Sequence, residues 1–205
     1  DEYDRFCHHL MVIHEPSGTT IGTYRLQTAE MARAARGFYS ADEFTIDRWP
    51  EDVLGESCEI GRACIHADHR HRRVLLVLWR GLATYVVISR KRYFFGCCSL
   101  TSQDPAEAAR TAEYLRCKGH VHPSLDLDPT PEFDAHEQQY SVEGWEDVHL
   151  PTLFRTYLRY GARICGRPAI DRAFKTIDFL ALLDLDEVDA DRILRQFEVD
   201  LRERS

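Results

Sequence analysis

The amino-acid sequence predicts a single α/β (α+β) domain in which a mixed sheet packs against helices. Strand-like and helix-like segments alternate along most of the 205 residues, which is typical of layered architectures with one core. The length is ordinary for one domain, and 44% hydrophobic with 29% charged residues is an ordinary globular composition. We therefore expect residues 1–205 to form one domain that needs no disulfide or metal to fold.

The elements of the first half begin with a β-hairpin. Residues 8–14 and 20–26 are strand-like runs, and the segment 15–18 between them contains a proline and a glycine, which favour a turn. A short Ala-rich helix is expected over residues 28–36, with Thr28 as its N-cap.

The middle of the chain holds its most apolar segment. A strand is expected at 58–65, and the run 74–90 is apolar on nearly every face, as expected for a helix buried against a sheet. Because Arg80 and Thr84 interrupt this run, it is too short to span a bilayer, which takes about 20 apolar residues. Another strand is expected at 93–99.

The last part of the chain contains three predicted helices and a long loop. A helix is expected over 104–117, since an aspartate and a proline open it. The polar, proline-containing segment 119–149 is expected to be a long loop that covers a functional site. A helix over 150–161, a buried strand over 176–183 and an amphipathic helix over 189–202 complete the prediction.

Charge and cysteine content limit the function classes. The net charge is −8, whereas nucleic-acid-binding domains are usually basic, so no nucleic-acid partner is expected. The seven cysteines form no spaced framework and no signal peptide is recognised, which predicts a soluble cytoplasmic protein. No strongly basic amphipathic segment suggests a membrane-active protein, although peripheral contact with the inner membrane stays open. The sequence starts at Asp1 without an initiator Met, so we expect a natural N-terminal segment to be missing.

Positive charge is concentrated between the strand 58–65 and the apolar helix. Arg70, Arg72 and Arg73 lie there, with histidines between them. Unpaired N–H groups and the helix dipole attract anions to the start of a helix, so this order predicts a phosphate site. The alternative is a basic loop that is merely solvated.

Several sequence blocks resemble, in order, the acyltransferases of the GNAT superfamily. The blocks are CHHLMVIHEPSGTTIGTYRL, GFYSADEF, EIGRACIHADHR, LLVLWRGLATYV, YFFGCCSL and the tail LPTLFRTYLRYGARICGRPAIDRAFKTIDFLALLD, and together they cover most of the chain. They are similar to the branch that contains ornithine N-acyltransferases (long labelled hemolysin-like), N-acyl amino acid synthases and acyl-homoserine-lactone (autoinducer) synthases. The tail and the Glu-x-x-Arg strand resemble the ornithine branch most.

The resemblance implies a fold and a reaction. The fold is a mixed, mostly antiparallel central sheet flanked by helices, with a splayed strand pair that forms a cleft for acyl-pantetheine. The reaction transfers a fatty acyl or long-chain 3-hydroxyacyl group from acyl carrier protein to the α-amine of an amino acid. Ornithine is the expected acceptor and lyso-ornithine lipid the expected product. No cofactor is implied beyond the thioester of the donor.

Two departures from the family pattern qualify these expectations. The glycine-containing pyrophosphate loop of acetyl-CoA-using relatives is replaced by a loop rich in histidine and arginine, which suits an acidic carrier protein better than CoA. A helix with an Arg-Tyr-Arg-like pattern, which relatives carry ahead of the acidic segment Asp1-x-x-Asp4, is absent. The alternatives are an acyl-homoserine-lactone-type signal synthase and a non-catalytic protein that binds an acyl carrier or lipid.

Glu59 is the candidate general base. An amino-acid amine is mostly protonated at neutral pH, so a base must take a proton, directly or through water, before nitrogen attacks the thioester. On an ideal strand Glu59 and Arg62 would point to opposite faces. A β-bulge at Gly61 would bring both toward one cleft and free a backbone N–H to polarise the thioester oxygen. The alternative is that Glu59 is a structural partner of Arg62.

The remaining candidate residues bind substrates. Arg62 is expected to hold a carboxylate or the pantetheine, the alternative being an ion pair between strands. Arg25 matches a substrate-side arginine of the lactone synthases, and its alternative is a strand end in solvent. Asp1 and Asp4 complete the acceptor side. The donor is assigned to the loop arginines at positions 70, 72 and 73, together with the glycine at 61.

No metal site is expected. The pattern His66-x-x-His69-x-His71 contains three imidazoles, but the chain has neither Cys-x-x-Cys nor a helical His-x-x-x-His pair.

Overall fold

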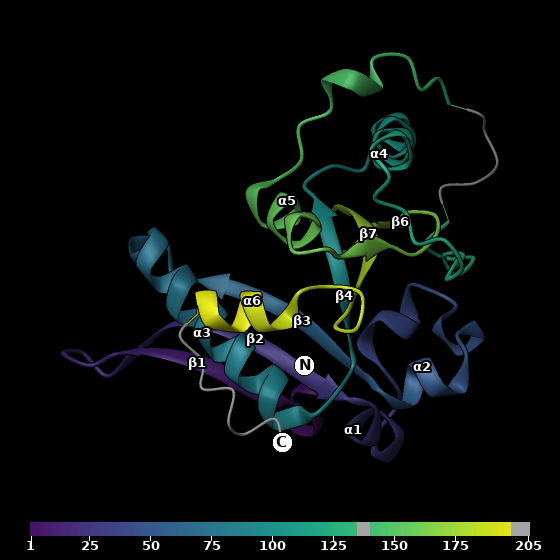
Figure 1. Ribbon diagram of the computed structural model, residues 1–205. Helices are drawn as coiled ribbons and strands as arrows, with labels where there is room; N and C mark the ends of the chain where they lie inside the picture. Colours follow the sequence, from purple (N-terminus) through teal and green to yellow (C-terminus); the bar gives the residue numbers. More distant parts are fainter. Residues whose placement is uncertain (135–139, 198–205) are drawn as a thin grey trace. The chain divides into compact units, whose positions relative to one another are not determined.

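The computed structural model describes residues 1–134 and 140–197. The strands are β1 (His8–His14), β2 (Thr19–Thr28), β3 (Ser57–Ile65), β4 (Tyr93–Leu100), β5 (Arg163–Ile164), β6 (Ala169–Asp171) and β7 (Thr176–Asp184). They form a sheet in the order β1-β2-β3-β4-β7-β5, with β6 beside β7 (Figure 1). The pairs β1–β2, β2–β3, β5–β7 and β6–β7 are antiparallel. The predicted sheet, mostly antiparallel and flanked by helices, is confirmed, and its splayed strand pair stays a prediction.

The helices differ in length and type. The α-helices are α1 (Ala29–Ala34), α2 (Glu51–Gly55), α3 (Arg72–Ser89), α4 (Pro105–Cys117), α5 (Thr152–Arg159) and α6 (Ala190–Gln196). Single 3₁₀ turns are η1 (Tyr3–Phe6), η2 (Tyr39–Asp42), η3 (Ile46–Arg48), η4 (Ala67–His69) and η5 (Trp145–Asp147). Within the described ranges, no helix combines the length and the hydropathy that crossing a membrane requires.

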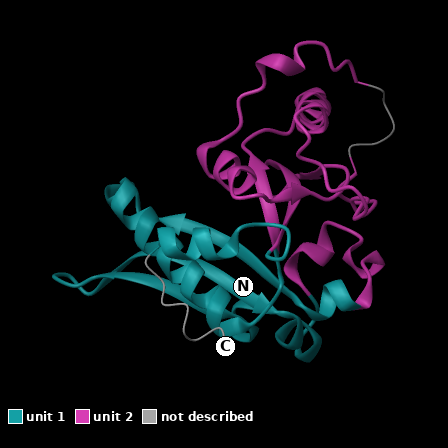
Figure 2. Ribbon diagram, viewed as in Figure 1, with its two compact units in different colours: residues 1–37, 52–94, 185–205 teal, residues 38–51, 95–184 magenta. Residues whose placement is uncertain are grey.

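The chain divides into two compact units, which are described in turn (Figure 2). Unit 1 consists of residues 1–37, 52–94 and 185–205, and unit 2 of residues 38–51 and 95–184. The expectation of one domain stays a prediction.

In unit 1, helix α3 packs against one face of the β1–β2 hairpin. Val74 and Leu78 of α3 form a buried cluster with Ile21 and Tyr24 of β2. Gly22 permits this close approach, because an added Cβ there would lie only 3.1 Å from side-chain atoms of both helix residues. The packing explains why the run after residue 73 is apolar, and it leaves the opposite face of the hairpin for other contacts.

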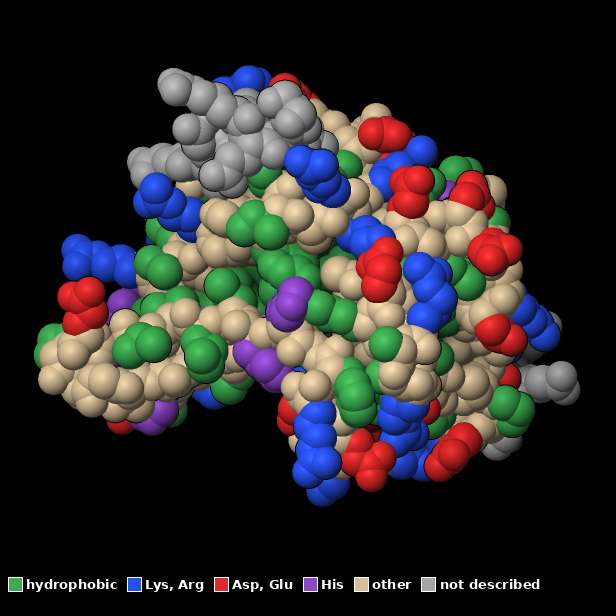
Figure 3. Space-filling model, turned by 90° about the horizontal axis from the view of Figure 1, so that it is seen from below, with side chains coloured by type: hydrophobic (Ala, Val, Ile, Leu, Met, Phe, Trp, Pro, Cys, Tyr) green, Lys and Arg blue, Asp and Glu red, His purple; other side chains and the backbone are tan. Residues whose placement is uncertain are grey.

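That opposite face carries the alternate residues of the hairpin. Met11 and Ile13 of β1 are each 54% exposed, and hydrophobic side chains are visible along the hairpin, at the left of Figure 3. On β2 the same face carries Arg25, which pairs with His9 of β1 across the sheet. Arg25 is only 5% exposed. The β1–β2 hairpin therefore has an open tip and a covered base, and the covered base carries Arg25 of the predicted site.

In unit 2, strand β7 is buried along most of its length. Ile177 and Phe179 are fully buried and pack with Leu115 of α4 and Phe154 of α5. A strand covered on both sides reads as a nearly continuous apolar run, which is why the sequence predicts it correctly.

The predicted long loop, 119–149, forms no α-helix among its described residues. It contains the 3₁₀ turn η5 and a bridge in which Pro129 pairs with Phe44. Gly166 has φ +93°, and a Cβ at this position would lie 1.9 Å from the carbonyl oxygen of Leu127 in the loop. Only glycine therefore allows the loop backbone to lie here. A covering role for the loop stays a prediction.

Most predicted helices and strands are present, with shifted ends. The helix expected over 28–36 ends at Ala34, and Thr28 is its N-cap, accepting a hydrogen bond from the Met31 backbone N–H at 3.5 Å. The final helix ends at Gln196, and the rest of the expected span 189–202 from 198 onward lies outside the described residues.

Candidate active site

A β-bulge lies in β3, one residue later than predicted. Gly61 pairs with Arg25 in regular register, and Cys64 pairs with Thr23. Between these two pairs β2 contributes one residue and β3 contributes two, which is the definition of a bulge. The left-handed residue is Arg62, with φ +52°. The prediction that Gly61 itself would form the bulge is therefore wrong in position.

The conformation of Arg62 is costly for a residue with a side chain. A left-handed backbone costs a non-glycine residue about 1–2 kcal/mol. Strain of this kind is often found at functional sites, where surrounding contacts maintain it. Such a contact exists, because Arg62 Nη2 lies 2.7 Å from Asp1 Oδ2. The bulge thus turns Arg62 toward the side chains on the face that carries Arg25.

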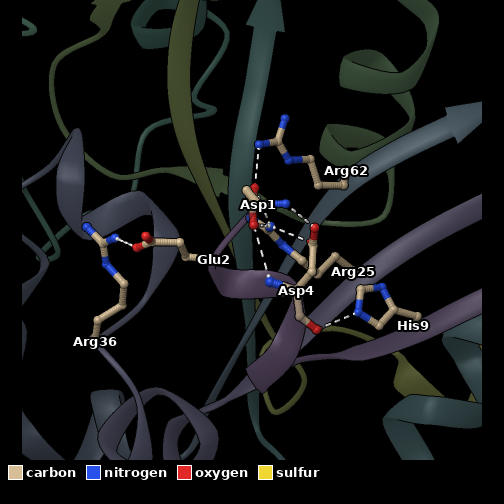
Figure 4. Close-up of polar contacts among 7 residues, drawn as sticks. All are labelled: Asp1, Glu2, Asp4, His9, Arg25, Arg36 and Arg62. Carbon is tan, nitrogen blue, oxygen red and sulfur yellow. Dashed lines mark hydrogen bonds and ion pairs between the residues drawn. The ribbon is translucent and has the colours of Figure 1, made fainter.

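Arg25 and two aspartates form the centre of the cluster (Figure 4). Arg25 Nη1 donates hydrogen bonds to Asp1 Oδ1 and Oδ2, both at 2.8 Å, and to Asp4 Oδ1 at 3.1 Å. The side chain of Arg25 is 6% exposed, whereas that of Arg62 is 38% exposed. Arg25 is therefore buried within the cluster, whereas Arg62 is accessible from solvent.

Glu59 lies on the same face of the sheet. It pairs with Gln27, two residues from Arg25 on β2, and side chains two positions apart share a face. Glu59 is 5% exposed. Burial raises the pKa of the neighbouring Cys7 thiol, the charge of Arg25 opposes this, and the charges of Glu59 and Asp4 raise the pKa further. Arg25, Glu59 and Asp4 thus all lie within electrostatic reach of the Cys7 thiol.

Three residues that the sequence did not suggest support this cluster. Tyr3 is 5% exposed, and the Cζ atom of Arg25 lies 5.5 Å from the centre of its ring. His9 Nε2 lies 2.9 Å from the carbonyl oxygen of Asp4. Cys7 is the third. Their closeness in sequence to Asp1 and Asp4 is the feature that could have suggested these three residues. No sequence pattern indicates which side chains near Asp1 and Asp4 face the cluster.

The basic loop lies at the other end of β3. Arg72 and Arg73 are exposed in the first turn of α3, which has no acidic residue, and Arg70 Nε donates to the Ile65 carbonyl oxygen at 3.4 Å. From Glu59 to Ile65 the strand extends about 20 Å at about 3.3 Å per residue. The structure therefore brings together Asp1, Asp4, Arg25, Arg62, Gly61 and Glu59 and places the three loop arginines apart from them.

Histidines accompany this loop. The ring of His69 lies 5.2 Å from that of His14 and 5.7 Å from that of His66, measured between ring centres. Their ligand atoms do not converge as a group of three among the described residues, and the absence of a metal at this loop stays a prediction.

Unit 2 contains a separate group of buried acids. Glu43, Asp171 and Asp178 have carboxylate oxygens within 4.8 Å of one another, a spacing that a metal ion could bridge. Burial raises the pKa of Asp178, hydrogen bonds from Ser99 and Thr176 lower it, and the charge of Asp171 raises it. Asp171 also accepts hydrogen bonds from two backbone N–H groups of the following turn. Hydrogen bonds within unit 2 thus satisfy much of this acidic group.

Comparison with known proteins identifies relatives of this chain. Residues 1–80 match the family model described as "Acetyltransferase (GNAT) domain". The L-ornithine N(alpha)-acyltransferase of Brucella abortus is 31% identical over 206 residues, covering 92% of this chain and 70% of that protein. The enzyme of the same name from Rhizobium meliloti is 29% identical, with 92% and 67% coverage.

A solved structure has the same fold. The CoA-dependent acyl-homoserine lactone synthase BjaI, determined with SAM and isopentyl-CoA, aligns with a TM-score of 0.52 at 12% identity. The alignment covers 97% of this chain and 68% of that one.

Proposed function

Because this chain belongs to the GNAT acyltransferase family, we propose that it transfers a fatty acyl or long-chain 3-hydroxyacyl group from acyl carrier protein to the α-amine of ornithine. The product is an N-acyl amino acid, lyso-ornithine lipid. The names of the relatives in Brucella abortus and Rhizobium meliloti support this acceptor. The observation that carries the proposal is the cluster of Arg25, Arg62, Asp1 and Asp4 beside Glu59. We place the reaction in the cytoplasm, with peripheral contact with the inner membrane where the product enters it.

The charges of the cluster suit a basic amino acid. The side chains of Arg25 and Arg62 contribute two formal positive charges and those of Asp1, Asp4 and Glu59 three negative ones, so these five side chains carry a net formal charge of −1. An amino acid with a second ammonium group carries a complementary charge of +1. In this proposal the accessible Arg62 binds the α-carboxylate of the acceptor, since guanidinium groups recognise carboxylates well. The aspartates, which Arg25 holds in place, face its ammonium groups.

Glu59 then acts as the base. It removes a proton from the acceptor ammonium, directly or through water, and the neutral nitrogen attacks the thioester carbonyl. A carbon–nitrogen bond forms and the carbon–sulfur bond breaks. The attacking nitrogen loses its second proton, and the leaving thiolate takes up one proton to give the free pantetheine thiol. The bulge after Gly61 supports this step, because an irregular strand has backbone N–H groups that are not used in the ladder and can polarise the thioester oxygen.

The donor docks at the basic loop. Residues 69–103 contain no Asp or Glu, in a chain whose net charge is −8. Arg70, Arg72 and Arg73 lie at the start of this stretch and at the N-terminus of α3, where both the helix dipole and the side chains attract a phosphate. An acidic carrier protein bearing phosphopantetheine has complementary charge.

The test is a product assay with purified protein. The protein is incubated with acyl carrier protein or CoA thioesters and with ornithine, lysine, glycine or S-adenosylmethionine, and products are identified by mass spectrometry. We expect N-acylornithine from the carrier-protein thioester. An acyl-homoserine lactone from S-adenosylmethionine would instead indicate a signal synthase, and no acylated product with any acceptor would contradict the proposed function.

A further inference from the structure

Two guanidinium groups lie near the ring of Tyr3. Its side chain is almost completely buried, with 5% of the residue exposed. The Cζ atom of Arg25 is 5.5 Å from the centre of the ring, and the Cζ atom of Arg36 is 4.8 Å from it. Cations within about 6 Å of an aromatic ring centre are attracted to its π-electrons. The Tyr3 ring therefore contacts one arginine of the site and one arginine outside it.

The two arginines come from different elements. Arg25 lies in β2, and Arg36 follows α1. Arg36 Nη1 forms an ion pair with Glu2 Oε2 at 2.8 Å, next to Tyr3 in sequence (Figure 4). Tyr3 itself belongs to the 3₁₀ turn that also carries Asp4. A single short segment thus holds Arg25 by two means, carboxylates and an aromatic ring.

We propose that Tyr3 is a positioning residue, whose ring fixes the orientation of the Arg25 guanidinium and through it the carboxylates of Asp1 and Asp4. The Nη1 atom of the Arg25 guanidinium donates hydrogen bonds to three carboxylate oxygens, two of Asp1 and one of Asp4. The buried ring adds a contact on the same group, because the face of an aromatic ring attracts a guanidinium. The inference rests on the proposed function, in which these aspartates face the acceptor.

The test compares Tyr3→Phe, which keeps the ring, with Tyr3→Leu, which keeps an apolar side chain but loses the π-face. For Tyr3→Leu we expect the KM for ornithine to rise about 3- to 30-fold, the range that one cation–π contact provides. The kcat at saturating ornithine and the KM for the donor should change little. Tyr3→Phe should retain the wild-type KM for ornithine.

Tyr93→Leu is the matched control. Tyr93 is 9% exposed, the Cζ atom of Arg92 lies 4.8 Å from the centre of its ring, and Arg92 forms an ion pair with Asp186. Tyr93→Leu removes a comparable buried ring, so it should lower the melting temperature without the ornithine-specific rise in KM. Equal rises in both leucine variants would reduce Tyr3 to a structural role and overturn the inference.

A second readout does not depend on the reaction. Side-chain ¹⁵N NMR detects the Arg25 Nη groups separately when rotation of the guanidinium is slow, and an Arg25→Lys spectrum assigns them. We expect resolved signals in wild type and Tyr3→Phe and averaged signals in Tyr3→Leu. If wild-type protein acylates no amino acid, the proposed function fails while this measurement still decides the role of Tyr3. Unchanged Arg25 signals in Tyr3→Leu would overturn it.

Discussion

Arg25 and Arg62 lie on neighbouring strands, and both bind the carboxylate of Asp1. The Nη1 atom of Arg25 is 2.8 Å from it, and the Nη2 atom of Arg62 is 2.7 Å from it. Regular alternation along β3 would direct Arg62 away from this face. The shared contact exists because the extra residue after Gly61 and the left-handed backbone of Arg62 reverse that direction.

Substitutions at Arg62 should separate backbone strain from side-chain function. Arg62→Gly and Arg62→Ala both remove the guanidinium, so both should raise the KM for the amino acid. Glycine also relieves the left-handed strain, so Arg62→Gly should be more stable than Arg62→Ala by about 1 kcal/mol in denaturant unfolding. Equal stability of the two variants would mean that residue 62 is not held in the left-handed conformation.

Charge reversal in the basic loop should affect the donor. The triple variant Arg70→Glu, Arg72→Glu, Arg73→Glu should raise the KM for acyl carrier protein by at least about tenfold, and added salt should weaken binding to wild type in the same direction. Arg90→Glu, at the other end of α3, is the control and should have a small effect. Unchanged donor kinetics in a folded triple variant would remove the docking assignment.

The contact between Glu30 and Lys91 should make stability depend on pH. The Lys91 ammonium, 2.5 Å from Glu30 Oε1, lowers the pKa of this carboxyl to about 2. Because the folded-state pKa is below the unfolded value, the stabilisation is complete above pH of about 4.5 and is lost as pH falls toward about 2. Glu30 is 60% exposed, so its contribution is at most about 1 kcal/mol.

Comparison with Glu30→Gln measures this contribution. The free energy of unfolding of wild type should exceed that of the variant at pH 6, and the two should converge near pH 2. A difference that stays constant between pH 6 and pH 2 would contradict the ion pair.

Alanine substitutions at two glycines with nearly equal φ should lower the stability of the protein by different amounts. Gly166 (φ +93°) contacts the Leu127 backbone, whereas Gly37 (φ +95°) has no atom near an added Cβ. Gly37→Ala should cost only backbone strain, about 1–2 kcal/mol. Gly166→Ala should cost a further 1–3 kcal/mol or more, roughly the range for overpacking, and should loosen the loop around Leu127. Similar melting temperatures for the two variants would contradict this close approach.

The four charged residues of the acceptor cluster can be predicted from the sequence more readily than the position of the bulge and the role of Tyr3. The family resemblance predicts Asp1, Asp4, Arg25 and Arg62 as site residues, and the structure brings them together. Gly61 predicts a bulge at its own position because glycine is a natural site for one, but the left-handed residue is Arg62, whose side chain contacts Asp1. Tyr3 was missed because no local pattern indicates that one ring faces two arginines 22 and 33 positions away.

The same reasoning explains the elements that the sequence did not predict. Strands β5 and β6 have two and three residues, too few for the alternation of side chains to be recognised, and their pairing with β7 alone defines them. In contrast, β7 and α3 were predicted because long buried elements have continuous apolar patterns.

The role of Glu59 as general base is the central claim, and Glu59→Gln tests it most directly. The substitution keeps shape and hydrogen bonding but removes the base, so kcat at neutral pH should fall about 10²- to 10⁴-fold while the KM for the donor stays near wild type. Raising the pH should partly restore activity, because more of the acceptor amine is then already neutral. The measurement is a pH–rate profile with a melting temperature on the same preparation. A stable variant with wild-type kcat at neutral pH would contradict the account.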